Sequence, residues 1–140
     1  MNGFLLDTNV LSELIKAEPD GNVVRWVEET EETILFLSVL TLGEVRSGIE
    51  RMNPGRRRGQ LESWFKVDLR QRFQNRILSI TDTIADRWGA LSASAAKKGR
   101  PLPVIDGLLA ATALHHDLIV VTRNDVDVNG TGVPTLNPWR

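Results

Sequence analysis

Acidic and amide side chains that could hold a metal ion stand at four separated stations along the 140-residue chain: Asp7, Glu44, Asp106 and the cluster Asn124, Asp125 and Asp127. Carboxylates that are brought together repel one another unless a hard cation neutralises them. Mg²⁺ and similar cations prefer oxygen ligands of this kind. If the fold gathers these four stations, the sequence predicts a metal site.

Two of the stations directly follow short apolar runs, Gly3–Leu6 and Leu118–Val121. Both runs have the length of a strand, and both are apolar throughout rather than alternating. Strands of this type are covered by helices on both faces, which indicates a parallel sheet with ligands beyond its carboxyl ends. Asp7 and the Asn124 cluster are therefore expected to be neighbours in space, although they lie far apart in the sequence.

The remaining pattern alternates strands with helices, which is typical of an α/β domain. At 140 residues the chain is expected to form one domain, residues 1–140. We expect helices at about 8–16, 21–31, 41–52, 57–73, 82–98 and 104–116, and strands at about 3–7, 34–38, 77–80, 118–122 and 133–136.

Composition excludes several functional classes. The chain has 17 Lys and Arg against 18 Asp and Glu, so no global basic field favours nucleic acid and any such binding must be local. It has no cysteine, which excludes disulfides and thiolate metal ligands. No secretion signal or membrane-spanning run of about 18 apolar residues is present. We therefore expect a cytoplasmic protein that does not bind a membrane.

Each acid also has a purely structural interpretation. Asp7 has the position of a helix N-cap. Thr41 and Glu44 have the spacing of a capping box, in which the Glu reaches back to the N–H of the capping residue. Asp106 stands in an expected first helical turn, where the helix dipole stabilises a carboxylate. Asp125 and Asp127 fall in a polar loop.

These separate interpretations leave the convergence of the acids unexplained. Asp106 shares one helical face with Ala110 and Ala113. Small residues there allow the helix to approach its neighbour closely and bring the carboxylate inward, which an exposed cap would not require. The sequence therefore favours one shared site over independent caps.

Several runs, taken in their order and spacing, carry a family resemblance. The chain resembles the PIN-domain ribonucleases, specifically the VapC-type toxins of bacterial toxin–antitoxin pairs, including the FitB-like branch. The similar segments cover almost the whole chain: 5–10, 37–44, 48–49, 99–101 before Asp106, 110–111, 121–124 and 137–139.

The resemblance implies a PIN-like three-layer sandwich with a central, mainly parallel sheet of four to five strands flanked by helices. It also implies that Asp7, Glu44 and Asp106 are the principal acidic residues. The fourth acidic position stays open between Asn124, Asp125 and Asp127. Our assignment of catalytic residues is Asp7, Glu44, Asp106 and Asp127.

The implied chemistry is hydrolysis of RNA assisted by Mg²⁺, or by Mn²⁺ in its place. In our hypothesis Asp7 and Asp106 bind the metal and Glu44 orients or deprotonates water. Thr122, with Asn124, Asp125 or Asp127, completes the polar surroundings. Whether one ion or two bind is left open.

The resemblance implies three partners: an RNA substrate, with tRNA and other structured RNAs as candidates, a VapB-like antitoxin and a second copy of the chain in a homodimer. Candidate RNA contacts are Arg46 and Arg123 near the acids, and the basic cluster Arg56, Arg57 and Arg58. The antitoxin is expected in an apolar groove around Trp64 and Phe65.

Two rival functions remain open at the level of sequence. Asn124 brings no negative charge, which is compatible with a non-catalytic PIN-like binding module. A phosphoacceptor or phosphatase domain would also gather acids at strand ends, with Asp7 as its nucleophile.

Overall fold

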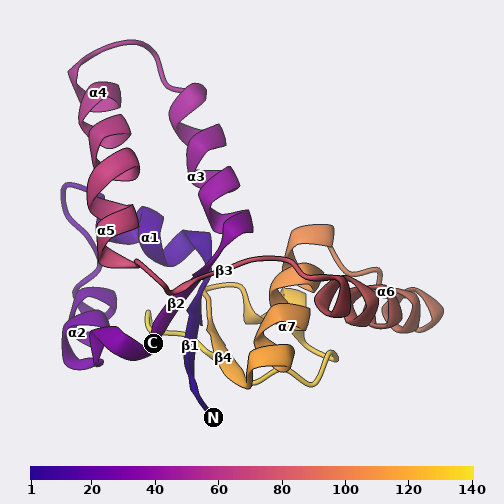
Figure 1. The fold of residues 1–140 in the computed structure, drawn as a ribbon. Coiled ribbons are helices and arrows are strands. Elements are labelled where there is room, and N and C mark those ends of the chain that lie inside the picture. Colours follow the sequence, from indigo (N-terminus) through magenta and orange to yellow (C-terminus); the bar gives the residue numbers. More distant parts are fainter.

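Five parallel strands form one sheet in the computed structural model, which describes residues 1–140 (Figure 1). The sheet order is β3-β2-β1-β4-β5, and every neighbouring pair is parallel. The two edge strands, β3 and β5, have only two residues each. The expected α/β class and the parallel sheet are confirmed, with these strand bounds: β1 Gly3–Leu6, β2 Leu35–Ser38, β3 Ile77–Leu78, β4 Leu118–Val121 and β5 Thr135–Leu136.

Strand β1 lies at the centre of the sheet, where the chain changes direction across it. The first crossovers build β2 and β3 on one side of β1, and the later ones place β4 and β5 on the other side. Leu6 at the end of β1 is paired in register with Val121 at the end of β4. The carboxyl ends of β1 and β4 thus meet at a topological switch point, where open α/β sheets bind their ligands.

The helices connect these strands and agree closely with the expected ranges. The one expected helix at 57–73 is in fact a continuous helical stretch made of α4, a π-helical segment η2 and α5. No helix of the structure combines the length and the apolar character needed to cross a membrane. The bounds are α1 Thr8–Leu14, α2 Gly21–Glu29, η1 Glu32–Ile34, α3 Val39–Glu50, α4 Arg56–Ser63, η2 Trp64–Leu69, α5 Arg70–Arg72, α6 Asp82–Lys97, α7 Val104–His116 and η3 Asp125–Val128.

The sheet carries a separate hydrophobic core on each face, which gives the three-layer sandwich. Successive residues of a strand point to opposite faces. Accordingly, Leu6 belongs to the core under α1 to α5, and Leu5 belongs to the core under α7. Figure 1 shows the α3–α4 hairpin on one side of the sheet and α7 on the other, with α6 packed on α7.

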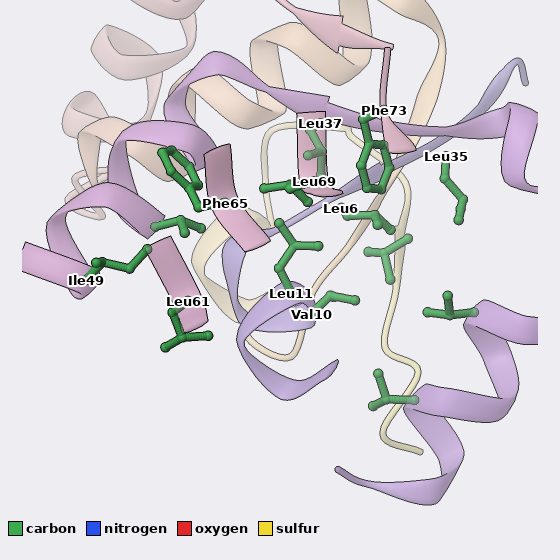
Figure 2. Packing of buried hydrophobic residues seen from close by; sticks show 14 residues of the cluster. Leu6, Val10, Leu11, Leu35, Leu37, Ile49, Leu61, Phe65, Leu69 and Phe73 are labelled. Atoms are coloured by element: carbon green, nitrogen blue, oxygen red, sulfur yellow. The ribbon is translucent and has the colours of Figure 1, made fainter. Parts of the chain in front are cut away.

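The stretch from α4 to α5 buries one side chain every four residues (Figure 2). Four residues exceed the 3.6 residues of an α-helical turn, so a regular α-helix would rotate these side chains gradually away from the core. The wider turns of η2 take up that excess. The four side chains Leu61, Phe65, Leu69 and Phe73 consequently all contribute to the core formed with α1 and α3.

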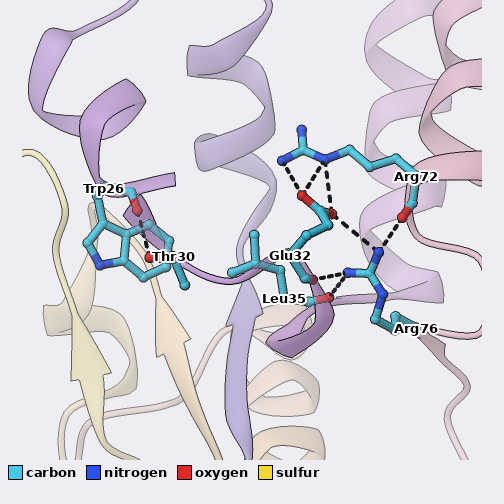
Figure 3. Close-up of polar contacts among 6 residues, drawn as sticks. All are labelled: Trp26, Thr30, Glu32, Leu35, Arg72 and Arg76. Atoms are coloured by element: carbon cyan, nitrogen blue, oxygen red, sulfur yellow. Dashed lines mark hydrogen bonds and ion pairs between the residues drawn. The ribbon is translucent and has the colours of Figure 1, made fainter. Parts of the chain in front are cut away.

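A network of arginines fastens the end of α5 to the start of β2 (Figure 3). Arg72 pairs with Glu32 at 3.0 Å, and both side chains are about two-fifths exposed. Arg76 is more enclosed, and its guanidinium donates to the main-chain carbonyls of Glu32, Leu35 and Arg72. Because the carbonyl of Arg76 also accepts the N–H of Leu37, this residue sets the position of β3 beside β2.

We expect Arg76→Ala to lower the free energy of unfolding by about 1–3 kcal/mol, because three main-chain carbonyls each lose one hydrogen bond. Arg72→Ala removes an exposed ion pair and a contact over the ring of Phe73, and should cost about 1 kcal/mol or less. Urea unfolding of both variants, followed by circular dichroism, measures the two losses. Equal losses would contradict the structural role given to Arg76.

Candidate active site

Asp7 stands directly after β1, at the switch point of the sheet. Its main-chain N–H donates to the carbonyl of Val121 at 2.9 Å, which continues the pairing of β1 with β4. One carboxylate oxygen, Oδ1, accepts the N–H of Thr8 at 2.7 Å as the N-cap of α1. The other, Oδ2, accepts the hydroxyl of Thr122 at 2.9 Å. Asp7 is therefore both a cap and a member of a polar cluster.

Thr122 is the centre of that cluster. It directly follows β4 and is only 2% exposed. Besides donating to Asp7, its Oγ1 accepts the side-chain amide of Asn9 at 3.4 Å and the main-chain N–H of Asn124 at 3.1 Å. A buried hydroxyl with three partners fixes the orientation of the Asp7 carboxylate.

Glu44 reaches the same region from α3. That helix begins at Val39, and Ser38 is its N-cap, with Oγ accepting the N–H of Leu40 at 3.0 Å. Thr41 therefore lies inside the helix, and the capping-box interpretation of Glu44 is wrong. Instead, Oε1 of Glu44 accepts the hydroxyl of Thr8 at 2.5 Å. Thr8 thus joins Glu44 to the helix that Asp7 caps.

Asp106 enters from the opposite face of the sheet, in the first turn of α7. Ala110 and Ala113 on its helical face are fully buried against the sheet. Gly107 marks a close contact with α6, since an added Cβ would stand 2.9 Å from Trp88 Cδ1 and 2.9 Å from Leu102 Cδ2. Tight packing at the next residue therefore positions the Asp106 carboxylate.

The acids act on one another electrostatically. Burial, followed by the charges of Asp7, Asp127 and Glu44, raises the pKa of Asp106 to about 6. Burial also raises the pKa of Asp7, with a further contribution from Asp127, although the bonds from Thr122 and Thr8 oppose the shift. The charges of the other three stations thus act on Asp106.

The candidates for the fourth station differ in their partners. Asp127, in η3, is the one whose charge raises the pKa of both Asp7 and Asp106. Asp125 lies 3.8 Å from Arg140 and so turns toward the carboxyl-terminal segment. Asn124 is exposed and bonds to Thr122 through its main-chain N–H rather than its side chain. Because its charge acts on both Asp7 and Asp106, we prefer Asp127 for the fourth position.

No three acidic or histidine side chains of the chain converge closely enough to form a ready-made metal site. The donor set nevertheless fits a hard cation, because it consists of carboxylate, hydroxyl and amide oxygens. In addition, Oδ1 of Asn9 is buried without a hydrogen-bond partner, next to Thr122. An unsatisfied acceptor at this place fits the addition of a hydrated ion.

The arginines expected to contact RNA fall into two groups. Arg57 donates to the carbonyl of Ile15, and Arg58 pairs with Glu50 and Glu62 within the α3–α4 hairpin. Both therefore have structural partners, whereas Arg56 is exposed at the start of α4.

The arginines adjoining the acids also have partners. Arg46, two residues after Glu44, pairs with Glu50 at 3.2 Å and lies over the ring of Phe65. Arg123, directly after Thr122, is exposed and lies 5.3 Å from the ring centre of Trp139. Arg123 consequently presents the more accessible cation next to the acids.

An apolar groove of about 110 Å³ runs between α1, α3 and α4. Trp64 lines it as expected, but Phe65 does not, because Phe65 is 4% exposed and belongs to the core. Thr8 and Glu44 form its polar wall. The groove therefore borders the acidic site.

Sequence reasoning gave no role to Thr8, Asn9 or Gly107. Thr8 and Asn9 directly follow Asp7 at a strand end, a position that could have signalled their contribution. Gly107 directly follows an acid in a helix, where glycine is unfavourable without a packing reason. That cost is explained by the close approach of Trp88.

Comparison with known proteins agrees with this fold and site. Residues 4–129 match the model of the PIN domain family, and the chain belongs to that family. It is 34% identical over 135 residues to the VapC ribonuclease Y4jK of Sinorhizobium fredii, with 96% of each chain covered. It is 31% identical over 135 residues to the toxin FitB of Neisseria gonorrhoeae, with 96% of this chain and 97% of that one covered.

Solved structures give the same result. The crystal structure of FitAcB from Neisseria gonorrhoeae matches with a TM-score of 0.93 and 31% sequence identity. The match covers 98% of this chain and 99% of that one. The PIN-like sandwich inferred from the sequence is thereby confirmed.

Gly107→Ala should disturb the site through packing alone. The added methyl group would overlap Trp88 and Leu102, and the strain should lower the free energy of unfolding by about 1–3 kcal/mol. A smaller side chain at position 88 should relieve this strain. Gly107→Ala combined with Trp88→Leu should therefore lower the free energy of unfolding by less than the sum of the two single losses. Thermal unfolding of the four proteins in this cycle provides the measurement, and strict additivity would contradict the proposed contact.

Asp106 should govern part of the pH dependence of stability in metal-free protein. Its pKa of about 6 exceeds the ordinary value of 3.8, so the folded chain binds the proton more tightly than the unfolded chain. The free energy of unfolding therefore falls as the pH rises between these values and stays lower above them. Asp106→Asn removes this cost and should stabilise the protein at about pH 8 by about 1 kcal/mol, after allowance for screening by water.

Urea unfolding in EDTA at several pH values measures this difference, which should disappear below about pH 4. Asp82→Asn is the matched control, since Asp82 is an exposed acid in the first turn of α6. A destabilising effect of Asp106→Asn at about pH 8 would contradict the electrostatic account.

Proposed function

We propose that the protein is the toxin of a type II toxin–antitoxin pair and acts, as a single PIN domain, as a metal-dependent endoribonuclease that hydrolyses RNA phosphodiester bonds. One observation carries the proposal: at the switch point of a PIN-domain sheet, Asp106 lies near enough to Asp7, Asp127 and Glu44 for their charges to raise its pKa. The VapC ribonuclease and FitB toxin relatives support the activity and the class of partner. An RNA substrate implies a cytoplasmic site of action.

In this proposal Asp7 and Asp106 hold the metal, with Asp127 beside them. Mg²⁺, or Mn²⁺ in its place, would neutralise the carboxylates and lower the pKa of a water molecule. Thr122 keeps the carboxylate of Asp7 in a fixed orientation by donating to its Oδ2. No oxygen of the scissile phosphate could approach these acids without such neutralisation.

Glu44 is the group proposed to orient the attacking water and to accept its proton. The hydroxyl of Thr8 donates to Oε1 of Glu44, which fixes that carboxylate. The other oxygen, Oε2, makes no hydrogen bond within the protein and remains free to accept from water. Asn9 contributes an unsatisfied acceptor to the same region.

The cognate antitoxin is proposed to bind the apolar groove between α1, α3 and α4. An amphipathic helix lays its apolar side chains into grooves of this kind. Because Glu44 and Thr8 form the wall of the groove, a partner bound there would lie beside the proposed catalytic residues. Inhibition by occlusion would follow. A homodimer of the toxin remains a prediction.

Asp7→Asn should reduce cleavage of RNA about 100-fold or more, because a metal ligand loses its charge. The carboxamide oxygen can still accept the N–H of Thr8, so the cap and the fold should persist. Cleavage is measured on total cellular RNA with Mg²⁺, with Mn²⁺ and with EDTA, using toxin separated from its antitoxin.

Asp82→Asn is a close control, because Oδ1 of Asp82 accepts the N–H of the following residue, as Oδ1 of Asp7 does. It should cleave like the unmodified protein. Cleavage by Asp7→Asn at the unmodified rate would remove the proposed mechanism. If the unmodified protein takes up Mg²⁺ but leaves RNA intact, the chain is a binding module instead.

A further inference from the structure

A second cavity, of about 290 Å³, lies between the end of α6, the segment 98–103 and the loop around η3. Asp127 and Pro103 line this cavity, Pro103 directly precedes the helix α7 whose first turn holds Asp106, and η3 packs against α7. The cavity and the acidic site therefore share a wall. A polymer that passes through one can continue into the other.

Two cations, Lys98 and Arg100, line the same cavity. Neither forms an ion pair within the protein. They are also the only cationic side chains that line it, and Asp127 is the only acidic one. The cavity is thus positively charged, while the neighbouring site is strongly acidic.

The main chain that carries these cations has a defined conformation at the end of α6. Gly99 has a φ of +73°, and the N–H groups of Gly99 and Arg100 donate to the carbonyls of Ala96 and Ala95, each at 3.0 Å. This is the pattern of a Schellman motif, which ends a helix in a defined turn. Pro101 and Pro103 then restrict the chain further. The main chain of this wall is therefore restricted, while the side chains of Lys98 and Arg100 are exposed.

The helix dipole explains only part of this arrangement. A cation in the last turn of a helix is favourable, and Lys97 and Lys98 both satisfy that preference. Arg100 lies beyond the helix, and only Lys98 and Arg100 line the cavity. Stabilisation of the helix end alone does not explain why both side chains line the same cavity.

The remaining lining has the mixed character of a nucleotide site. Leu91, Leu102 and Val126 provide apolar surface. Val126 is 73% exposed, so its side chain is accessible to a ligand. Ser94 and Asn129 add polar groups. The volume is close to the lower limit of about 300 Å³ for small-molecule sites, which suits a single nucleotide rather than a larger ligand.

We propose that this cavity is a subsite that binds one nucleotide of the RNA adjacent to the scissile phosphate, with Lys98 and Arg100 holding the flanking phosphate. This inference rests on the proposed ribonuclease function. RNA is favoured over an acidic protein segment because the occupant must continue past Asp127 into a site built of carboxylates. A phosphodiester chain can do so with its phosphates bound alternately by metal and by cationic side chains.

The test is the salt dependence of RNA binding. Each cation that contacts a single-stranded phosphate contributes about 0.7 to the slope of log K against log salt, so Lys98→Ala with Arg100→Ala should lower the slope by about 1.4. Affinity should fall about tenfold. Binding of a mixed-sequence RNA oligonucleotide is measured by fluorescence anisotropy with Mg²⁺, in the Asp7→Asn background to prevent cleavage.

Arg87→Ala with Lys97→Ala is the matched control, because it removes the same two charges from exposed positions of α6 outside the cavity. Its slope should change by less than about 0.5. Lys98→Arg with Arg100→Lys keeps both charges and should retain the slope. Equal slopes for the two double alanine variants would overturn the subsite.

The outcomes separate this inference from the proposed function. If the protein with Asp7 intact cleaves RNA but the two alanine variants bind RNA equally, the subsite alone fails. If it cleaves no RNA under any metal condition, the ribonuclease function fails. Loss of antitoxin binding in Lys98→Ala with Arg100→Ala, with an unchanged RNA slope, would reassign the cavity to the protein partner and would also overturn the subsite.

Discussion

Repulsion among carboxylates is the constraint around which this fold is arranged. The parallel sheet delivers Asp7 and Thr122 side by side, while α3 and α7 bring Glu44 and Asp106 from opposite faces. Two threonine hydroxyls hold two of these acids in place. Burial, followed by the charges of the neighbouring acids, raises the pKa of Asp106 to about 6, so its ionised form is costly in the metal-free protein. Packing in both cores must offset that cost. The acidic site therefore lowers the net stability of the fold, and in return it favours the binding of a cation.

The sequence predicted most of the fold because its signals were local and mutually consistent. Apolar runs such as Leu118–Val121 have the length and the β-branched character of buried parallel strands, and their carboxyl ends indicated where the acids would meet. The helix at 57–73 was correctly placed, but its π-helical segment was not, because hydrogen-bond pattern within a helix depends on the core against which it packs. The resemblance to PIN proteins supplied the rest.

Competition for partners across the fold explains what short motifs could not settle at the site. Thr41 and Glu44 have a capping spacing, but Ser38 takes the cap and Thr8 takes the glutamate. Arg57 and Arg58 form a basic cluster in the sequence, yet a helix end and two glutamates bind them in space. Short motifs report the chemistry that a residue can perform, and only tertiary structure decides which partner it finds.

The two-residue strands at both edges of the sheet restrict how any protein can bind this one. An edge of that length offers too few main-chain donors and acceptors for a foreign strand to be added. Recognition must then depend on side chains fitting surfaces formed by helices. Discrimination between similar antitoxins would consequently depend on a few apolar contacts. A small number of substitutions at these contacts would then prevent a toxin from binding the antitoxin of a related pair in the same cell.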